Sequence, residues 1–227
     1  MKIALDAMGG DLAPQATVQG ALSALRQTNN EIHIVLVGDE EQIKAELGNS
    51  IPDNISIFPT TEIVTMHDNG SKVIKSKPDS SLVQGIKLVK ENKADAFISA
   101  GHTGAVMATS LFLLGRIPHV KRPCLGAYLK TQKGGKIICD VGANPDAKAE
   151  QLLQFGIMAS VYLDHVEGIK DTKVGLINIG EEPSKGSELY LEAYKLLKNE
   201  LPNFIGNVEG RHVFDCEIGR ASCRERV

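Results

Sequence analysis

The sequence has 227 residues, enough for one large domain or two small ones, and carries a formal net charge of −3. This charge argues against a nucleic-acid-binding protein, and the apolar stretches are too short to span a membrane. The first residues form a strand pattern at once, so we expect no signal peptide. The four cysteines have neither disulfide-framework nor metal-site spacing, which predicts a reduced, cytoplasmic protein without a bound metal.

Strand and helix patterns alternate along the chain. Residues 60–78 are polar and irregular, which predicts a loop or flap with some helix, and residues 133–136 form a glycine turn that joins two antiparallel strands. The other predicted elements, in chain order, are a strand at 2–6, a helix at 14–27, a strand at 32–37, a helix at 39–47, a strand at 55–58, a helix at 80–92, a strand at 94–98, a helix at 106–114, strands at 124–129 and 136–139, a helix at 147–166, a strand at 174–178, a helix at 187–200 and a strand at 204–208.

This order predicts an α/β fold with a mostly parallel sheet, helices on both faces and an inserted β-hairpin. No linker divides the chain, so we assign residues 1–216 to one domain. Residues 217–227 lack apolar periodicity and match the translation of a widely used sequencing adapter. They are predicted to be a non-native tail on a protein truncated near residue 216; a genuine basic tail is the alternative.

Four polar, glycine-containing turns follow predicted strands. They are the Asp6 turn (residues 6–11), the Ser99 turn (99–104), the Asp140 turn (140–144) and the Asn178 turn (178–186). The Ser99 turn opens a helix, where the N–H groups of Thr103, Gly104 and Ala105 are expected to be unpaired and suited to an anion. Because the carboxyl ends of parallel strands share one edge of a sheet, we expect all four turns to meet at one cleft.

Each turn also has a purely structural interpretation, which the sequence leaves open. Gly9 and Gly10 suit a tight turn, and Asp11 suits a helix cap. Asp140 is a common turn former, and His102 is more often a turn residue or a ligand-orienting donor than a catalytic base. Established phosphate-loop, nucleophile-elbow and dinucleotide-binding motifs are absent from the sequence.

The four motifs, in their order along the chain, resemble the bacterial phosphate acyltransferases called PlsX. The resemblance covers residues 1–215 and rests on Asp-Ala-Met-Gly-Gly-Asp, Ser-Ala-Gly-x-Thr-Gly-Ala, Asp-x-Gly-Ala-Asn and Asn-Ile-Gly-Glu-Glu followed by Lys-Gly. It implies a fold similar to isopropylmalate dehydrogenases and phosphate acetyltransferases. It also implies transfer of a fatty acyl group from acyl carrier protein to inorganic phosphate, forming acyl phosphate for phospholipid synthesis.

The family resemblance further implies a homodimer and a cytoplasmic enzyme that associates peripherally with the inner face of the membrane. The part implicated in both contacts lies beyond residue 216, where family members continue with a further motif, Asp-Gly-Phe-x-Gly-Asn. No cofactor is implied. An acyl-CoA-dependent phosphate acyltransferase, a decarboxylating dehydrogenase and an inactive anion-binding remnant remain as alternatives.

For this reaction we predict that the Ser99 turn holds phosphate and that Lys185 is the cation for phosphate or the developing oxyanion. His102 and Asn144 are candidate catalytic donors. The acidic residues are expected to orient donors rather than touch phosphate, because like charges repel. The full set of candidate phosphate- and substrate-binding residues is Asp6, Gly9, Gly10, Asp11, Ser99, Gly101, Thr103, Gly104, Asp140, Asn178 and Glu181.

Two surfaces are predicted for the acyl donor. An apolar groove for the acyl chain has four candidate residues, although ordinary core is the more common role for each: Met8, Met107, Leu111 and Phe112. Acyl carrier protein is acidic, so Lys72, Lys75 and Lys77 are candidates for receiving it, with a solvated loop as the alternative.

Overall fold

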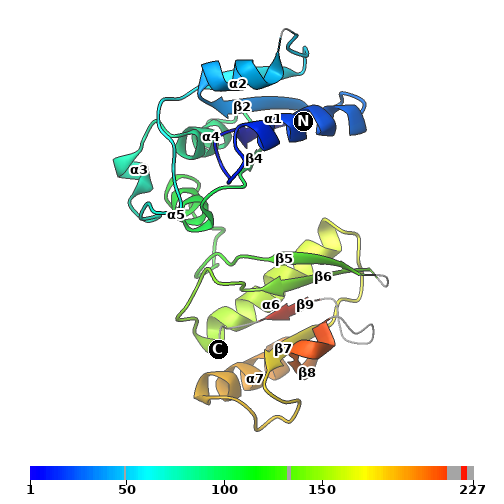
Figure 1. Ribbon diagram of the computed structural model, residues 1–227. Coiled ribbons are helices and arrows are strands. Elements are labelled where there is room, and N and C mark those ends of the chain that lie inside the picture. Colours follow the sequence, from blue (N-terminus) through cyan, green and yellow to red (C-terminus); the bar gives the residue numbers. More distant parts are fainter. Residues whose placement is uncertain (49, 132–133, 214–220, 224–227) are drawn as a thin grey trace. The chain divides into compact units, whose positions relative to one another are not determined.

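The computed structural model describes residues 1–48, 50–131, 134–213 and 221–223. The chain forms two compact units, Met1–Gly115 and Arg116–Val227, each with its own sheet (Figure 1). The sequence predicted one domain over residues 1–216. No change of composition near residue 115 indicates a boundary, because a break in the pattern of contacts leaves no local signal in the sequence.

The first unit contains a parallel four-stranded sheet with the strand order β3-β2-β1-β4. Its elements are β1 (Lys2–Asp6), α1 (Gln15–Gln27), β2 (His33–Gly38), α2 (Glu40–Leu47), β3 (Ile55–Pro59), α3 (Val73–Ser76), α4 (Ser81–Lys90), β4 (Ala96–Ile98) and α5 (Thr103–Leu113).

Both faces of this sheet are covered by helices (Figure 1). Along β2, Ile34 and Leu36 pack with the α1 and α2 side, whereas Val35 and Val37 pack with Leu88 of α4. A strand buried on both faces is continuously apolar, as this one is. The α/β class predicted from the sequence is confirmed.

The second unit has the strand order β5-β6-β9-β7-β8, in which only β5 and β6 pair antiparallel. Side chains of α6 and α7, among them Phe155 and Leu197, form one core with Ile137 and Leu176 of the sheet. The elements are β5 (Ala127–Thr131), β6 (Gly134–Cys139), α6 (Ala149–His165), β7 (Val174–Asn178), α7 (Glu188–Glu200), β8 (Phe204–Glu209), the 3₁₀ helix η1 (Gly210–Val213) and β9 (Ala221–Cys223).

The inserted hairpin is confirmed, but its turn was predicted too late in the chain. Gly134 already pairs with Thr131 as the first residue of β6, and residues 132–133 lie outside the described residues. Gly134 and Gly135 both pair with β5 and so belong to the strand, which their composition did not suggest. Of the predicted tail 217–227, only β9 is described, and its pairing with β6 and β7 was not anticipated.

Candidate functional site

The Asp6 and Ser99 turns lie side by side because β1 and β4 are neighbouring parallel strands, with Leu5 opposite Ile98. The Ser99 hydroxyl donates a hydrogen bond to Oδ2 of Asp6 at 2.7 Å and accepts one from the Gly101 N–H at 3.0 Å. Asp6 is 2% exposed. Through this bond Asp6 links the two turns, while the role of the acidic residues as orienting groups stays a prediction.

The other two turns follow β6 and β7, which belong to the second sheet. The prediction that one sheet edge gathers all four turns is therefore wrong. The argument holds for each pair of turns separately, because β6 and β7 both run parallel to β9.

Glycine is needed where the first two turns approach each other. A Cβ atom on Gly9 would lie 2.5 Å from Oδ2 of Asp6 and 2.9 Å from Oγ of Ser99. Gly10 has φ of +109°, a conformation that L side chains rarely adopt. The tight-turn interpretation of this pair is thus correct, and the same geometry leaves the backbone close to any ligand at this edge.

The N-terminus of α5 offers two open N–H groups rather than the predicted three. The N–H of Ala105 donates to the backbone oxygen of His102 at 3.0 Å and approaches its ring Nδ1 at 3.3 Å, so the histidine caps the helix. Thr103 and Gly104 are exposed, and their N–H groups make no hydrogen bond within the described residues. These two groups are the candidate anion-binding donors of an eleven-residue helix.

His102 is engaged on both ring nitrogens. Because Nδ1 accepts from Ala105, Nε2 carries the proton and donates to the backbone oxygen of Asp68 at 3.1 Å. The side chain therefore fixes the loop around Asp68 against the start of α5. This geometry supports a positioning role for His102.

The segment Ile63–Met66, hereafter the strap, closes a pocket of about 350 Å³ over the two turns. Met8 lines the same pocket. The remaining lining comes from the turns themselves and is polar or small: Gly10, Asp11, Ala100, Gly101 and His102. Sequence reasoning missed the strap because its residues carry no motif and lie in a segment that has few regular elements.

A network of hydrogen bonds around Asp68 and Lys77 holds the strap in place. Oδ2 of Asp68 accepts from the Thr65 N–H at 2.6 Å, the Thr65 hydroxyl at 2.9 Å and Nζ of Lys77 at 2.7 Å. Nζ of Lys77 also donates to the backbone oxygen of Ile63 at 2.7 Å. The hydrogen bond from Lys77, together with those from Thr65, lowers the pKa of the Asp68 carboxyl to about 2. Lys77 is therefore engaged inside the fold, unlike the exposed Lys72 and Lys75.

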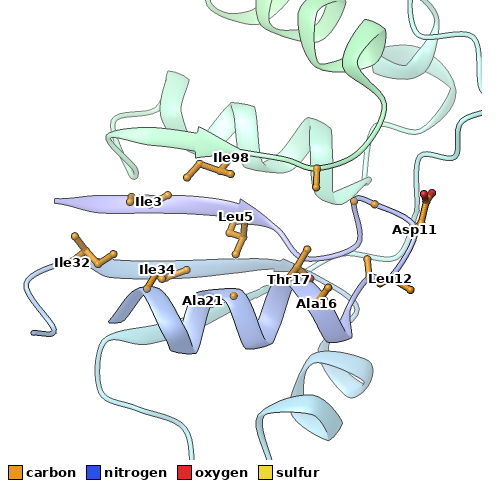
Figure 2. Close-up of a pocket in the computed structure, with 16 residues that line it drawn as sticks. Ile3, Leu5, Asp11, Leu12, Ala16, Thr17, Ala21, Ile32, Ile34 and Ile98 are labelled. Atoms are coloured by element: carbon orange, nitrogen blue, oxygen red, sulfur yellow. The ribbon is translucent and has the colours of Figure 1, made fainter. Parts of the chain in front are cut away.

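A second cavity, of about 570 Å³, lies between α1 and the strands and is almost wholly apolar (Figure 2). It shares Gly10, Asp11 and Ala100 with the lining of the first pocket. The labelled side chains on its walls come from the strands, Ile3, Leu5, Ile34 and Ile98, and from α1, Ala16, Thr17 and Ala21 (Figure 2).

In the second unit, Asp140 and Asn144 are buried and bonded to the backbone. Asp140 accepts from the N–H groups of Leu125 and Asn144, each at 2.6 Å. The Asn144 amide donates to the Pro123 backbone oxygen at 2.9 Å and reaches Asp140 at 3.3 Å. The geometry favours the turn-forming interpretation of Asp140. The Asn144 side-chain amide, a candidate catalytic donor, forms hydrogen bonds within the fold.

The Asn178 turn keeps Lys185 in solvent. Nδ2 of Asn178 donates to the Lys185 backbone oxygen at 2.9 Å, and Oδ1 accepts from the Ile179 N–H at 2.8 Å. The Lys185 side chain is exposed and forms no ion pair with any described residue. The Glu181 carboxylate lies 3.1 Å from Nδ1 of His212.

The predicted acyl-groove residues separate in the structure. Met8 lines the strap pocket, whereas Met107, Leu111 and Phe112 line neither of the two cavities described above. Phe112 is 70% exposed, so it is not the core residue that the alternative interpretation offered.

Two cysteines that looked scattered in the sequence are neighbours in the second unit. Cys124 and Cys139 line a small cavity of about 250 Å³, and a hydrogen bond from Cys139 lowers the pKa of the Cys124 thiol. Among the described residues, no cluster of His, Cys, Asp and Glu could hold a metal ion, and no helix is long and apolar enough to cross a membrane.

The α/β fold is similar to that of solved phosphotransacetylases. A phosphotransacetylase from Streptococcus pyogenes matches with a TM-score of 0.69 at 15% identity, over 98% of this chain and 76% of that one. EutD phosphotransacetylase from Staphylococcus aureus matches with a TM-score of 0.63 at 16% identity, over the same shares. At these identities the likeness shows the fold alone.

Within this class, the family is shown by sequence. The model of the family "Fatty acid synthesis protein" matches residues 1–219, and the chain belongs to this family. A phosphate acyltransferase from Halothermothrix orenii is 47% identical over 224 residues, covering 96% of this chain and 67% of that protein. One from Desulfitobacterium hafniense is 49% identical over 214 residues, covering 94% and 64%. The chain thus spans about two thirds of the length of these relatives.

Proposed function

We propose that this protein transfers an acyl group from a thioester to inorganic phosphate, releasing acyl phosphate and a thiol. The curated relatives named phosphate acyltransferase support this reaction. The observation that carries it is the pair of open N–H groups at Thr103 and Gly104, at the start of a helix whose preceding turn lines a pocket. Such a helix N-terminus binds phosphate through its N–H groups and its dipole.

The reaction needs positioning and charge more than a nucleophilic side chain. A phosphate oxygen attacks the carbonyl carbon, the C–S bond then breaks, and the proton of hydrogen phosphate ends on the leaving sulfur. Bringing the dianion to the carbonyl accounts for much of the catalysis. Asp6, bonded to Ser99, keeps the turn in shape without presenting a negative charge to phosphate.

The proposed acyl donor is the thioester of acyl carrier protein, an acidic protein. Lys72 and Lys75 are the exposed cations proposed to receive it, whereas Lys77 is engaged by Asp68. The proposal retains the homodimer, the cytoplasmic location and the peripheral contact with the membrane that the family resemblance implies.

One assay separates this function from its alternatives. The protein is mixed with phosphate and a long-chain acyl thioester of either acyl carrier protein or coenzyme A, and acyl phosphate is trapped as its hydroxamate. Acyl phosphate formed from the carrier-protein thioester supports the proposal. Acyl phosphate formed only from the coenzyme A thioester would mean that acyl-coenzyme A is the donor instead. Phosphate binding without product from either donor would make the protein an anion-binding protein.

Lys185 is the proposed cation for phosphate or the developing oxyanion. Removing one such group costs about 100-fold or more in turnover, so Lys185→Ala is expected to reduce acyl phosphate formation by that order. Lys198→Ala, an exposed lysine on α7, is the matched control and is expected to leave the rate unchanged. An unchanged rate for Lys185→Ala would remove Lys185 from the reaction.

A further inference from the structure

The strap presents large apolar side chains to solvent at the polar site. Ile63 is 39% exposed and Met66 is 67% exposed, although both line the pocket over the Asp6 and Ser99 turns. Neighbouring exposed apolar side chains can mark a ligand-binding groove. Here the backbone beneath them is fixed by the bonds to Thr65 and to Ile63 that Asp68 and Lys77 make.

The pocket therefore has two chemically different walls. One wall is formed by residues of the two turns, next to the open N–H groups of α5: Gly10, Asp11, Ala100, Gly101 and His102. The other wall is Ile63, Val64 and Met66. A ligand that matches both walls carries an anionic or strongly polar head joined directly to an alkyl chain.

We propose that the strap binds the acyl chain next to the reacting carbonyl, and that Met66 and Ile63 set the preference for chain length. This inference rests on the proposed acyl transfer to phosphate and adds the surface that recognises the acyl part. Methionine suits this role because its flexible, polarizable side chain adapts to a chain without a fixed shape.

The surroundings of the pocket give a long chain somewhere to continue. The apolar cavity beneath α1 shares Gly10, Asp11 and Ala100 with the strap pocket. An alkyl chain that passes this shared edge leaves the polar turns and meets Ile98 and Leu5 (Figure 2).

The test uses alkylphosphonates, which imitate acyl phosphate and do not hydrolyse. Methylphosphonate and decylphosphonate are titrated into the 227-residue protein by calorimetry, below the concentration at which decylphosphonate forms micelles. Burial of alkyl surface predicts that decylphosphonate binds at least about tenfold more tightly than methylphosphonate.

Met66→Ser is expected to reduce this preference for the long chain by about five- to tenfold and to leave the affinity for methylphosphonate unchanged. Met66→Leu is expected to keep the preference, because it conserves apolar volume. The matched control is Phe112→Ser, which removes a similarly exposed apolar side chain outside both cavities and is expected to have no effect.

The inference is overturned if decylphosphonate binds no more tightly than methylphosphonate, if neither binds, or if Met66→Ser weakens both equally. The outcome is independent of the transfer assay. A long-chain preference that depends on Met66, in a protein that forms no acyl phosphate, would retain the strap as an alkyl-binding surface and reject the transfer reaction.

Discussion

At the scale of single residues, the polar motif residues divide into those that hold the backbone and those that face solvent. Asp6, Asp140 and Asn144 are buried and bonded to neighbouring turns. Thr103 and Lys185 are exposed, and the Thr103 N–H and the Lys185 ammonium have no partner among the described residues. A sequence motif does not separate residues that shape a turn from residues that are free to contact a ligand, because both kinds occur at similar spacing along the chain.

Gly70 lies in the loop that follows the strap, and this loop packs closely against the start of α5. A Cβ atom there would lie 2.8 Å from the Ala105 nitrogen and 2.9 Å from the Gly104 carbonyl carbon, both backbone atoms that cannot move aside. Gly70→Ala is expected to lower the free energy of unfolding by about 1–3 kcal/mol, measured by urea denaturation.

The matched control for Gly70→Ala is Gly20→Ala, in the middle of α1. An added Cβ meets no atom within 4 Å there, so alanine is expected to stabilise the helix by about 0.5–1 kcal/mol. A Gly70→Ala protein as stable as the natural one would mean that the segment does not rest on α5 in solution.

At the scale of elements, the segment from Thr60 to Pro78 is more ordered than its composition indicated. The sequence predicted a loop or flap with some helix, and α3 is that helix. The order comes from side chains distant in sequence, such as Asp79, which accepts hydrogen bonds from both the N–H and the hydroxyl of Thr61. Local propensity cannot predict such a segment, because no repeat of apolar residues marks it.

The ion pair between Asp68 and Lys77 predicts a pH dependence of this segment. The pKa of Asp68 is about 2 in the folded protein, against 3.8 ordinarily, so the pair stabilises the fold above about pH 4 and loses its effect as pH falls through 2. Lys77→Met is expected to destabilise the protein at pH 6 and to differ progressively less from the natural protein as the pH falls toward 2, measured by urea unfolding.

Lys75→Met is the control for this comparison, since Lys75 is exposed on α3 and forms no ion pair with any described residue. It is expected to give a small difference that stays constant with pH. A Lys77→Met deficit of equal size at pH 6 and pH 2 would show that Asp68 is not the partner that matters.

At the scale of the whole molecule, each unit has its own sheet and its own core. The first unit buries aliphatic side chains on both faces of its sheet, which is what an independently folding domain needs. Residues 1–115 expressed alone are expected to keep α/β secondary structure and to melt cooperatively, as followed by circular dichroism. A broad, non-cooperative transition would show that the first unit needs residues beyond 115.

The sequence by itself determined the succession of strands and helices, the α/β class and the family, because hydrophobic periodicity, turn glycines and ordered motifs are local properties. The strand at 174–178 was predicted to the residue. Only the tertiary structure decided which strands share a sheet, that His102 caps α5 and removes the Ala105 N–H, and that Lys77 pairs with Asp68. These features depend on contacts between segments that are distant in the sequence and on the backbone geometry of turns. Local sequence patterns do not specify either of them.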